Sequence, residues 1–333
     1  MIQYLRHSSE SIKDFPMGDS PEREVPVFLP PGYDPKRSEA YPVVFFLAGW
    51  GARGSKYLAD DSIFNWSFPR IISKAIQDGS LPPMICVFPD GSSKLGCSQY
   101  VNSPALGNYL DYICDELVPL VDENFHTHAD ANYRAVTGHS SGGFGALICG
   151  MKRPDIFKVI CSSAGDSFFE VSVLPGLSPC LTEIEKAGGV ENFLEDFLSH
   201  PNPSSLGYTK FITMLTLSLA PCYAPNPSKP PLYGDLFFDV KTGEIIPEVW
   251  ERYLKWDPVR MIDKHQKELK SLSYVLLECG LQDEYAAQWG HRQIAEKLKK
   301  LGVSYELNEY PGKHSGQNWR FQERLSKMLK AMK

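Results

Sequence analysis

The sequence has no long hydrophobic run and no excess of positive charge, and each absence narrows the possible classes of protein. A membrane-spanning helix needs about 18 or more consecutive apolar residues, and no stretch approaches that length, so we expect no spanning segment. The 34 Lys and Arg are outnumbered by 40 Asp and Glu, which gives a net charge of −6. This mild acidity argues against nucleic acid or an anionic membrane surface as the main partner.

Paired cysteine motifs are also lacking, and we expect no secretory signal in residues 1–21. The eight cysteines include no Cys-x-x-Cys pair, and several lie in apolar runs, as buried reduced thiols do. We therefore expect a reducing compartment, the cytoplasm. Cys180 and Cys222, which both lie near prolines, are the freest to pair, and the sequence leaves that pairing open. Residues 1–21 are polar and lack the apolar centre of a secretory signal.

The 333 residues are 43% hydrophobic and 22% charged, which is typical of a folded globular chain. Predicted strands alternate with predicted helices, which favours an α/β fold with a mostly parallel sheet flanked by helices. Pro119 lies inside one predicted helix, where we expect a kink or a break. The predicted strands are 25–29, 42–47, 84–88, 133–137, 158–161, 272–279 and 304–307, and the helices are 71–76, 108–125, 144–151, 286–301 and 319–332.

Residues 167–256, called here the insertion, interrupt this alternation. They are rich in proline and contain one helix-like piece at 211–219. A segment of this length is too long for a simple loop. We expect a single domain, 1–333, in which the insertion caps the carboxyl edge of the sheet, where α/β folds bind ligands. The alternative is a separate second domain.

Residues 138–143 read Gly-His-Ser-Ser-Gly-Gly and lie between a predicted strand and a predicted helix. In that context Gly-x-Ser-x-Gly is typical of a nucleophile elbow. Ser140 then lies on a strained turn with its hydroxyl exposed, while Gly138 and Gly142 keep Cβ atoms out of crowded space. The alternative is a glycine-rich turn that needs only positive φ, because the motif is short and also arises by chance.

A second glycine-rich loop, residues 48–54, follows the predicted strand 42–47. In a hydrolase of this kind, one backbone N–H from such a loop joins the N–H of the residue after the nucleophile in an oxyanion hole. We nominate the N–H groups of Trp50 and Ser141. A plain strand-to-helix turn is the alternative reading of the loop.

A serine nucleophile needs a base that is oriented by a carboxylate, and in this type of fold the order is Ser, acid, His. Asp283 follows one predicted strand and His314 follows the next, so both emerge at the same edge as Ser140. We predict Asp283 as the acid and His314 as the base. Glu284 and Asp166 are the rival acids, and the plainer roles are an N-cap for Asp283 and a solvated loop residue for His314.

The other histidines are less well placed. His139 lies inside the elbow, where its ring is expected to pack beside Ser140. His126, His128 and Asp130 form a weak metal pattern in a polar loop, and we expect no metal there. The remaining histidines, in the tail, the insertion or helix-like stretches, are His7, His200, His265 and His291.

The chain resembles the esterase D-like putative esterases of the α/β-hydrolase superfamily, which include feruloyl and acetylxylan esterases, S-formylglutathione hydrolases, enterochelin esterases and mycolyltransferases. The stretches that carry the resemblance are VFLPPGY (27–33), YPVVFFLAGWG (41–51), FPDG (88–91), DELVP (115–119), GHSSGGFGA (138–146) and GKHSGQNW (312–319). They cover nearly the whole chain outside the insertion. By position, the resemblance implies the same triad and oxyanion donors. Many relatives have Leu-His-Gly where this chain has Leu47-Ala48-Gly49, and the insertion has no counterpart.

The expected activity is hydrolysis of a small-molecule carboxylic ester by Ser140, His314 and Asp283 through an acyl-enzyme, with no cofactor. Acyl transfer or thioester cleavage uses the same residues. A degenerate hydrolase that only binds ligands is the non-enzyme alternative, and the filled triad positions argue against it. The oligomeric state stays open. The insertion's aromatic residues, which fit either a substrate pocket or a packed core, are Phe168, Phe169, Tyr208, Tyr223 and Tyr233.

Overall fold

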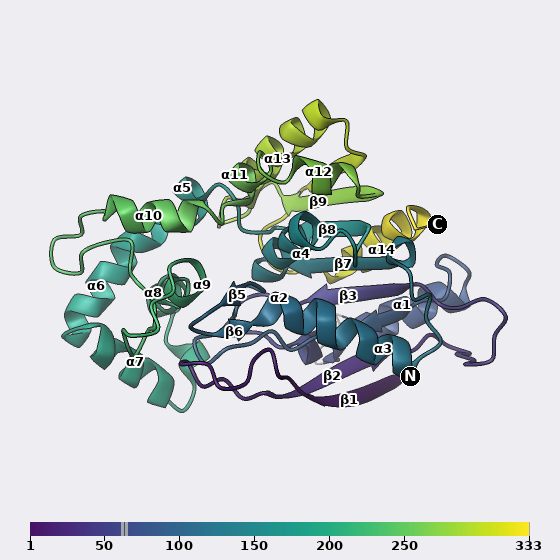
Figure 1. The fold of residues 1–333 in the computed structure, drawn as a ribbon, viewed down its shortest axis with the longest axis horizontal. Helices are drawn as coiled ribbons and strands as arrows, with labels where there is room; N and C mark the ends of the chain where they lie inside the picture. Colours follow the sequence, from purple (N-terminus) through teal and green to yellow (C-terminus); the bar gives the residue numbers. More distant parts are fainter. Residues whose placement is uncertain (61–62, 64–65, 333) are drawn as a thin grey trace.

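A central sheet organises the computed structural model, which describes residues 1–60, 63 and 66–332 (Figure 1). The first two strands in the order pair antiparallel, as do β2 and β4, and every pair from β4 onward is parallel. The strand order is β1 (Ile2–Ser8), β2 (Glu22–Phe28), β4 (Ile85–Val87), β3 (Val43–Leu47), β7 (Arg134–His139), β8 (Val159–Ser163), β9 (Tyr274–Gly280), β10 (Tyr305–Tyr310). The predicted mostly parallel α/β sheet is therefore confirmed.

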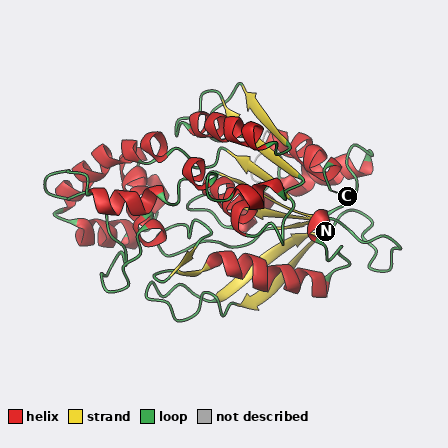
Figure 2. Ribbon diagram, turned by 45° about the horizontal axis from the view of Figure 1, so that its top comes forward, coloured by secondary structure: helices red, strands yellow, loops and turns green. Residues whose placement is uncertain are grey.

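Helices cover both faces of the sheet, and the inner strands β3 and β4 are accordingly apolar on every residue. Val44 and Phe46 of β3 pack with Phe68 and Phe321 on one face, where α1 (Phe68–Gln77) and α14 (Phe321–Lys330) lie. Alternate residues of the same strand face the second core. The helices on that other side are α2 (Tyr109–Asp111), α3 (Val118–Asn124), α4 (Ser141–Lys152), α11 (Pro258–Met261), α12 (Gln266–Lys270) and α13 (Ala287–Leu301) (Figures 1 and 2).

The predicted helix 108–125 is not broken at Pro119. Instead, α2 continues into a wider π-helical turn, Tyr112–Leu117, and then into α3. The Val118 N–H donates to the carbonyl of Ile113, five residues back. Because Pro119 has no N–H to offer, the helix before it accommodates the missing bond by widening.

Residues 2–8, whose polar composition indicates a tail, form an edge strand. β1 pairs along its whole length with β2, although most of its side chains are exposed or half-exposed. A strand that buries so little apolar surface has no hydrophobic pattern to reveal it. The predicted helix start at 108 also falls on a two-stranded ribbon, β5 (Asn102–Ser103) with β6 (Gly107–Asn108).

The insertion is mainly helical and lies to one side of the sheet, at the left of Figure 1. Its members are α5 (Phe169–Ser172), α6 (Leu177–Ala187), α7 (Val190–Ser199), α8 (Tyr208–Ser218), α9 (Ala220–Tyr223) and α10 (Pro247–Leu254). The helix expected at 211–219 is α8, and α6 packs against both α7 and α8. Shorter 3₁₀ turns occur at Gly54–Leu58, Ala131–Tyr133, Leu174–Gly176, Pro203–Ser205 and Asn318–Arg320.

All eight cysteines are buried free thiols, including Cys180 of α6 and Cys222 of α9, so neither of these two is in a disulfide. The Cys222 thiol faces the carbonyls of Ser218 and Cys97. None of the helices in the described part of the chain is both long and apolar enough to cross a membrane.

Candidate active site

Ser140 lies on the sharp turn between β7 and α4. Its backbone has φ 58° and ψ −123°, a strained conformation for a residue with a side chain. The turn is crowded on both sides. A Cβ at Gly138 would lie 2.2 Å from the carbonyl oxygen of Gly142, and a Cβ at Gly142 would lie 2.0 Å from that of Leu47. Both glycines are therefore required by close backbone contact, which is the geometry expected of a nucleophile elbow.

The loop after β3 runs directly against this turn. A Cβ at Gly49 would be 3.1 Å from the His139 carbonyl oxygen and 3.3 Å from Ser140 Cβ. The next residue, Trp50, is anchored by its indole N–H, which donates to Ser218 Oγ at 2.8 Å. Its ring meets that of Phe211 edge to face, with centroids 4.8 Å apart. The peptide that leads into Trp50 thus lies beside Ser140.

Ser141 is the first residue of α4. The first N–H groups of a helix have no partner within the helix, and the helix dipole makes them attractive to negative charge. Trp50 and Ser141 both line the same cavity as Ser140. The two residues nominated as oxyanion donors are therefore brought together at the elbow.

Asp283 and His314 meet in the loops after β9 and β10. The His314 Nδ1–H donates to Asp283 Oδ2 at 2.8 Å, and the Asp283 side chain is fully buried. Because Nδ1 faces a carboxylate, the proton belongs on Nδ1, and Nε2 is left as the basic nitrogen. Asp283 also accepts the Tyr285 N–H, and the Glu284 carboxylate accepts the His314 backbone N–H. Of the two acids in this turn, Asp283 alone contacts the imidazole.

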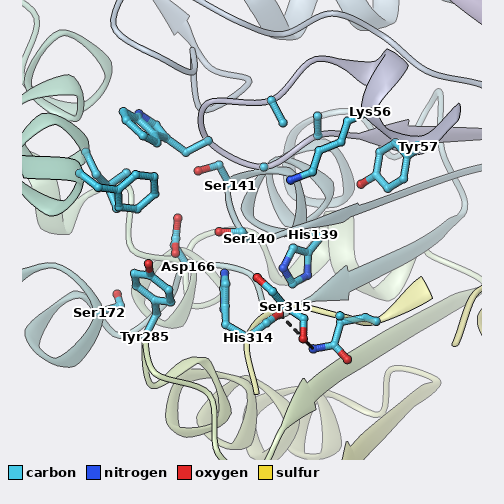
Figure 3. A pocket seen from close by; sticks show the side chains of 18 of the residues that line it. Lys56, Tyr57, His139, Ser140, Ser141, Asp166, Ser172, Tyr285, His314 and Ser315 are labelled. Atoms are coloured by element: carbon cyan, nitrogen blue, oxygen red, sulfur yellow. Dashed lines mark hydrogen bonds between the residues drawn. The ribbon is translucent and has the colours of Figure 1, made fainter. Parts of the chain in front are cut away.

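Ser140 and His314 share the wall of one cavity of about 500 Å³. Figure 3 shows the His314 ring rising from its loop toward Ser140. In the described part of the chain, their side chains are not directly hydrogen-bonded, and catalytic hydrogen bonds are often long before a substrate is bound. The insertion contributes to the wall of this cavity through Ser172, Val173, Phe211, Leu215, Leu219 and Tyr223.

Asp166, the rival acid after β8, lies in the cavity wall and does not touch His314. Burial raises the pKa of Asp166 to about 6, while the nearby His314 lowers this pKa and Asp283 raises it. The Ser141 side chain also lies near the Asp166 carboxyl group and lowers its pKa. This carboxyl group therefore faces the substrate cavity rather than the imidazole (Figure 3).

His139 packs beside the elbow, as expected. Its ring lies 4.7 Å from that of His314, and both line the cavity. Burial, followed by the neighbouring His314, holds the pKa of His139 well below its ordinary value, so this ring is neutral at pH 7. His291 is buried in α13 beside Ser162, and burial lowers its pKa to about 4.

The weak metal pattern resolves into structural contacts. His126 Nε2 faces the Arg37 carbonyl, His128 stacks on Tyr133 at 3.9 Å, and Asp130 caps a 3₁₀ turn. Among the described residues, no group of three or more His, Cys, Asp or Glu side chains could hold a metal ion. The other three weakly placed histidines also have partners. His7 contacts Glu116 at 2.6 Å, His200 accepts the Asn202 N–H, and His265 lies 4.0 Å from Glu268.

Sequence reasoning missed a buried charge cluster beneath the site. Glu278 of β9 is fully buried and binds both Arg320 and Arg324. Arg324 also donates to Ser163 Oγ at 2.9 Å, at the end of β8. A lone glutamate in an otherwise apolar strand is a visible signal, because buried carboxylates need partners.

One further residue of the site escaped notice. Tyr285 lines the cavity, and its ring lies 4.5 Å from that of His314. Of the five aromatic residues of the insertion considered for a pocket, only Tyr223 lines the cavity, whereas Phe169 is buried in the core and Tyr208 is exposed.

Comparison with known proteins identifies the family. A sequence model described as "Putative esterase" matches residues 20–332. The chain belongs to this esterase family. A protein of Xylanibacter ruminicola described as an endo-1,4-beta-xylanase/feruloyl esterase is 29% identical over 134 residues, which are 39% of this chain and 18% of that protein. The chain thus matches less than a fifth of that relative's length.

Similar solved structures confirm the α/β-hydrolase fold. One is a ferulic acid esterase, with a TM-score of 0.61 at 16% identity over 100% of this chain and 97% of that chain. Another is an S-formylglutathione hydrolase from Agrobacterium tumefaciens, with a TM-score of 0.59 at 18% identity over 100% and 96%. At these identities the likeness shows the fold alone. The esterase family match and the α/β-hydrolase fold therefore agree with each other.

Proposed function

We propose that Ser140, His314 and Asp283 form the catalytic triad of this esterase. The observation that carries the proposal is the 2.8 Å bond between His314 and buried Asp283, at a cavity whose wall also holds Ser140 on a strained elbow. His314 Nε2 takes the Ser140 hydroxyl proton as Oγ attacks the ester carbonyl. Asp283 fixes the ring and stabilises the imidazolium that results.

The N–H groups of Trp50 and Ser141 stabilise the tetrahedral oxyanion. A donor of this kind typically contributes about 3 to 4 kcal/mol to the transition state. When the intermediate collapses, His314 returns the proton to the leaving alcohol, and the acyl group stays on Ser140. Water then attacks this ester, with His314 again as base, and releases the carboxylic acid and free Ser140.

The same proposal makes residues 1–333 one domain in which the insertion caps the active site. Two observations support this. Phe211, Leu215 and Leu219, in or just after α8, line the cavity. The buried core of the sheet also continues into the insertion through Phe169, Cys180 and Leu217, which lie in one cluster with Val43 and Phe45. A shared core is what distinguishes a cap from an independent domain.

The substrate class proposed is a small carboxylic ester. The cavity, at about 500 Å³, has the size of a small-molecule site, and its aromatic wall of Trp50, Phe211, Tyr223 and Tyr285 suits an apolar or aromatic group. Feruloyl esters and S-formylglutathione, which the names of the similar proteins specify, are the first substrates to try. The eight free thiols favour a reducing compartment for the reaction, which supports a cytoplasmic location.

The test is hydrolysis of p-nitrophenyl esters of increasing acyl length, with a feruloyl ester and S-formylglutathione, by wild type, Ser140→Ala and Ser172→Ala. Ser172 is another cavity serine and serves as the matched control. We expect Ser140→Ala to lose turnover by about 10⁶ while Ser172→Ala stays within about threefold of wild type. Comparable activity in Ser140→Ala would contradict the mechanism. Adding a competing alcohol measures acyl transfer from the ratio of products.

A further inference from the structure

Two consecutive residues next to the active site, Gln99 and Tyr100, adopt positive φ angles of 53° and 55°. Neither is a glycine, so this left-handed conformation is strained and persists only where the surroundings hold it. Both side chains are buried, with at most 1% exposed. The mechanism described above uses neither of them.

The two side chains reach the two halves of the oxyanion hole. Gln99 Nε2 donates to Ser141 Oγ at 2.9 Å, and the Tyr100 hydroxyl donates to the Ala48 carbonyl at 2.7 Å. Ser141 carries one oxyanion N–H, and Ala48 lies two residues before Trp50, which carries the other. One dipeptide, called here the Gln99–Tyr100 brace, thus contacts both segments.

The brace is itself held firmly. The Tyr100 ring fits a slot between two glycines, because a Cβ at Gly91 or Gly145 would lie 2.3 Å or 2.6 Å from ring atoms. Ser98 Oγ donates to the Gly91 carbonyl and accepts the Tyr100 N–H. A ring packed in this way can fix the position of its hydroxyl relative to α4. It can therefore also fix the position of the Ala48 carbonyl, which accepts the hydrogen bond of the hydroxyl.

Such fixing matters because the two donors come from different elements. Trp50 follows β3, and Ser141 follows β7, the neighbouring strand. Figure 3 shows Ser141 beside Ser140 at the cavity wall. An oxyanion hole works through donors held at the right distance before the reaction, and a misplacement of about 1 Å can cost about 10²-fold in rate.

We propose that Gln99 and Tyr100 are positioning residues that hold the Trp50 and Ser141 N–H groups at the spacing the tetrahedral oxyanion requires. They touch neither substrate nor reacting atoms and act through Ala48 and Ser141. The inference rests on the proposed function, since it assumes that these two N–H groups bind the oxyanion.

The test compares Tyr100→Phe with Tyr112→Phe. Tyr112 is equally buried, but its hydroxyl has no hydrogen-bond partner in the described part of the chain, so it is the matched control. We expect Tyr100→Phe to lower kcat by about tenfold with KM within about twofold, less than the loss of a whole donor. Tyr112→Phe keeps the wild-type kcat. Affinity for a boronic acid, which forms a tetrahedral adduct on the serine, falls with kcat/KM, whereas affinity for the product carboxylate does not change.

A second pair of variants reaches the other half of the brace. Gln99→Met and Ser141→Ala remove the same bond from opposite ends, and Ser141→Ala keeps its backbone N–H. We expect each to lower kcat, and the double variant to lower it by no more than the larger single effect. This pair also decides the matter if Tyr100→Phe fails to fold.

The inference would be overturned if Tyr100→Phe and Gln99→Met kept the wild-type kcat and the wild-type affinity for the boronic acid. It would also be overturned if these variants lost affinity equally for the boronic acid and for the product carboxylate. Its failure is distinguishable from that of the proposed function. If wild type hydrolyses esters and Ser140→Ala does not, the triad stands and only the brace is wrong. If wild type is inactive and unlabelled by a fluorophosphonate, both fall.

Discussion

The loops after β8 and β9 leave neighbouring parallel strands at the same edge of the sheet, and each contains a buried or half-buried aspartate near the elbow. The two acids have different partners. Asp283 binds the His314 imidazole, whereas Asp166 lies near the Ser141 side chain and lines the cavity. Similar positions in the sequence pattern therefore give dissimilar chemistry.

Strand order accounts for the difference. His314 follows β10, and β10 pairs with β9 rather than β8. The loops after β9 and β10 are packed closely, because a Cβ at Gly280 would lie 2.3 Å from the Gly312 carbonyl oxygen. The loop after β9 therefore lies against the His314 loop, and its Asp283 occupies the Nδ1 side of the ring. Asp166, one strand further away, meets the start of α4 instead.

Replacing each aspartate by asparagine should give the largest difference in kcat between the two loops. We expect Asp283→Asn to lower kcat by about 10⁴, because the amide no longer favours the correct tautomer or stabilises the imidazolium. Asp166→Asn should lower kcat by less than about tenfold. Steady-state kinetics on one p-nitrophenyl ester measures both, and a larger loss in Asp166→Asn would reverse the assignment of the acid.

Beneath both loops lies the Glu278 cluster, which should matter for folding. Glu278→Gln leaves two buried guanidinium groups without their full partner, and we expect a loss of about 3–5 kcal/mol in the free energy of unfolding. The control is Glu306→Gln, whose partner Lys327 is partly exposed, with an expected loss of about 1 kcal/mol or less. Urea denaturation measures both losses. Equal losses of unfolding free energy in the two variants would show that the Glu278 cluster does not stabilise the fold more than an exposed ion pair does.

Asp166 should also affect the pH dependence of stability. Its pKa is about 6 in the folded chain and near 3.8 when unfolded, so the folded state holds the proton more tightly. The free energy of unfolding therefore falls as the pH rises from about 4 to 6. Above about pH 6 the destabilisation caused by ionised Asp166 stays constant. We expect Asp166→Asn to gain on the order of 1–2 kcal/mol over wild type at pH 7 and nothing below about pH 4. A gain independent of pH would contradict this.

Glu284, beside Asp283, should have the smallest effect. Its carboxylate accepts the His314 backbone N–H at 2.9 Å, but its side chain is 46% exposed. We expect Glu284→Gln to change kcat by less than about threefold, since an amide oxygen can accept the same bond and solvent screens the lost charge. A loss as large as that of Asp283→Asn would make Glu284 part of the triad.

The features that could be predicted from the sequence are those whose residues lie close together in the chain. The neighbouring strand β3 is apolar on every residue, and the glycines at 138 and 142 are part of a recognisable local motif, so both could be predicted. The order Ser, acid, His does not separate Asp166 from Asp283, because both lie between Ser140 and His314 in the chain. The pairing of β10 with β9 separates them, and strand pairing is not a local property of the sequence.

Other features left no local trace. The edge strand β1 buries too little to produce a pattern, and the helices of the insertion pack mainly on one another. The Gln99–Tyr100 brace depends on φ angles that neither residue type suggests. Among these features, only the ion pairs of Glu278 could have been predicted, because a charged residue in an apolar strand indicates a buried partner.

The most direct test of the account is the rate of fluorophosphonate labelling of wild type, Ser140→Ala, Asp283→Asn and Asp166→Asn, with the labelled peptide identified by mass spectrometry. We predict labelling at Ser140 in wild type and Asp166→Asn at similar rates, much slower labelling in Asp283→Asn, and none in Ser140→Ala. Labelling that persists without Ser140, or that depends on Asp166 and not on Asp283, would contradict the proposed triad.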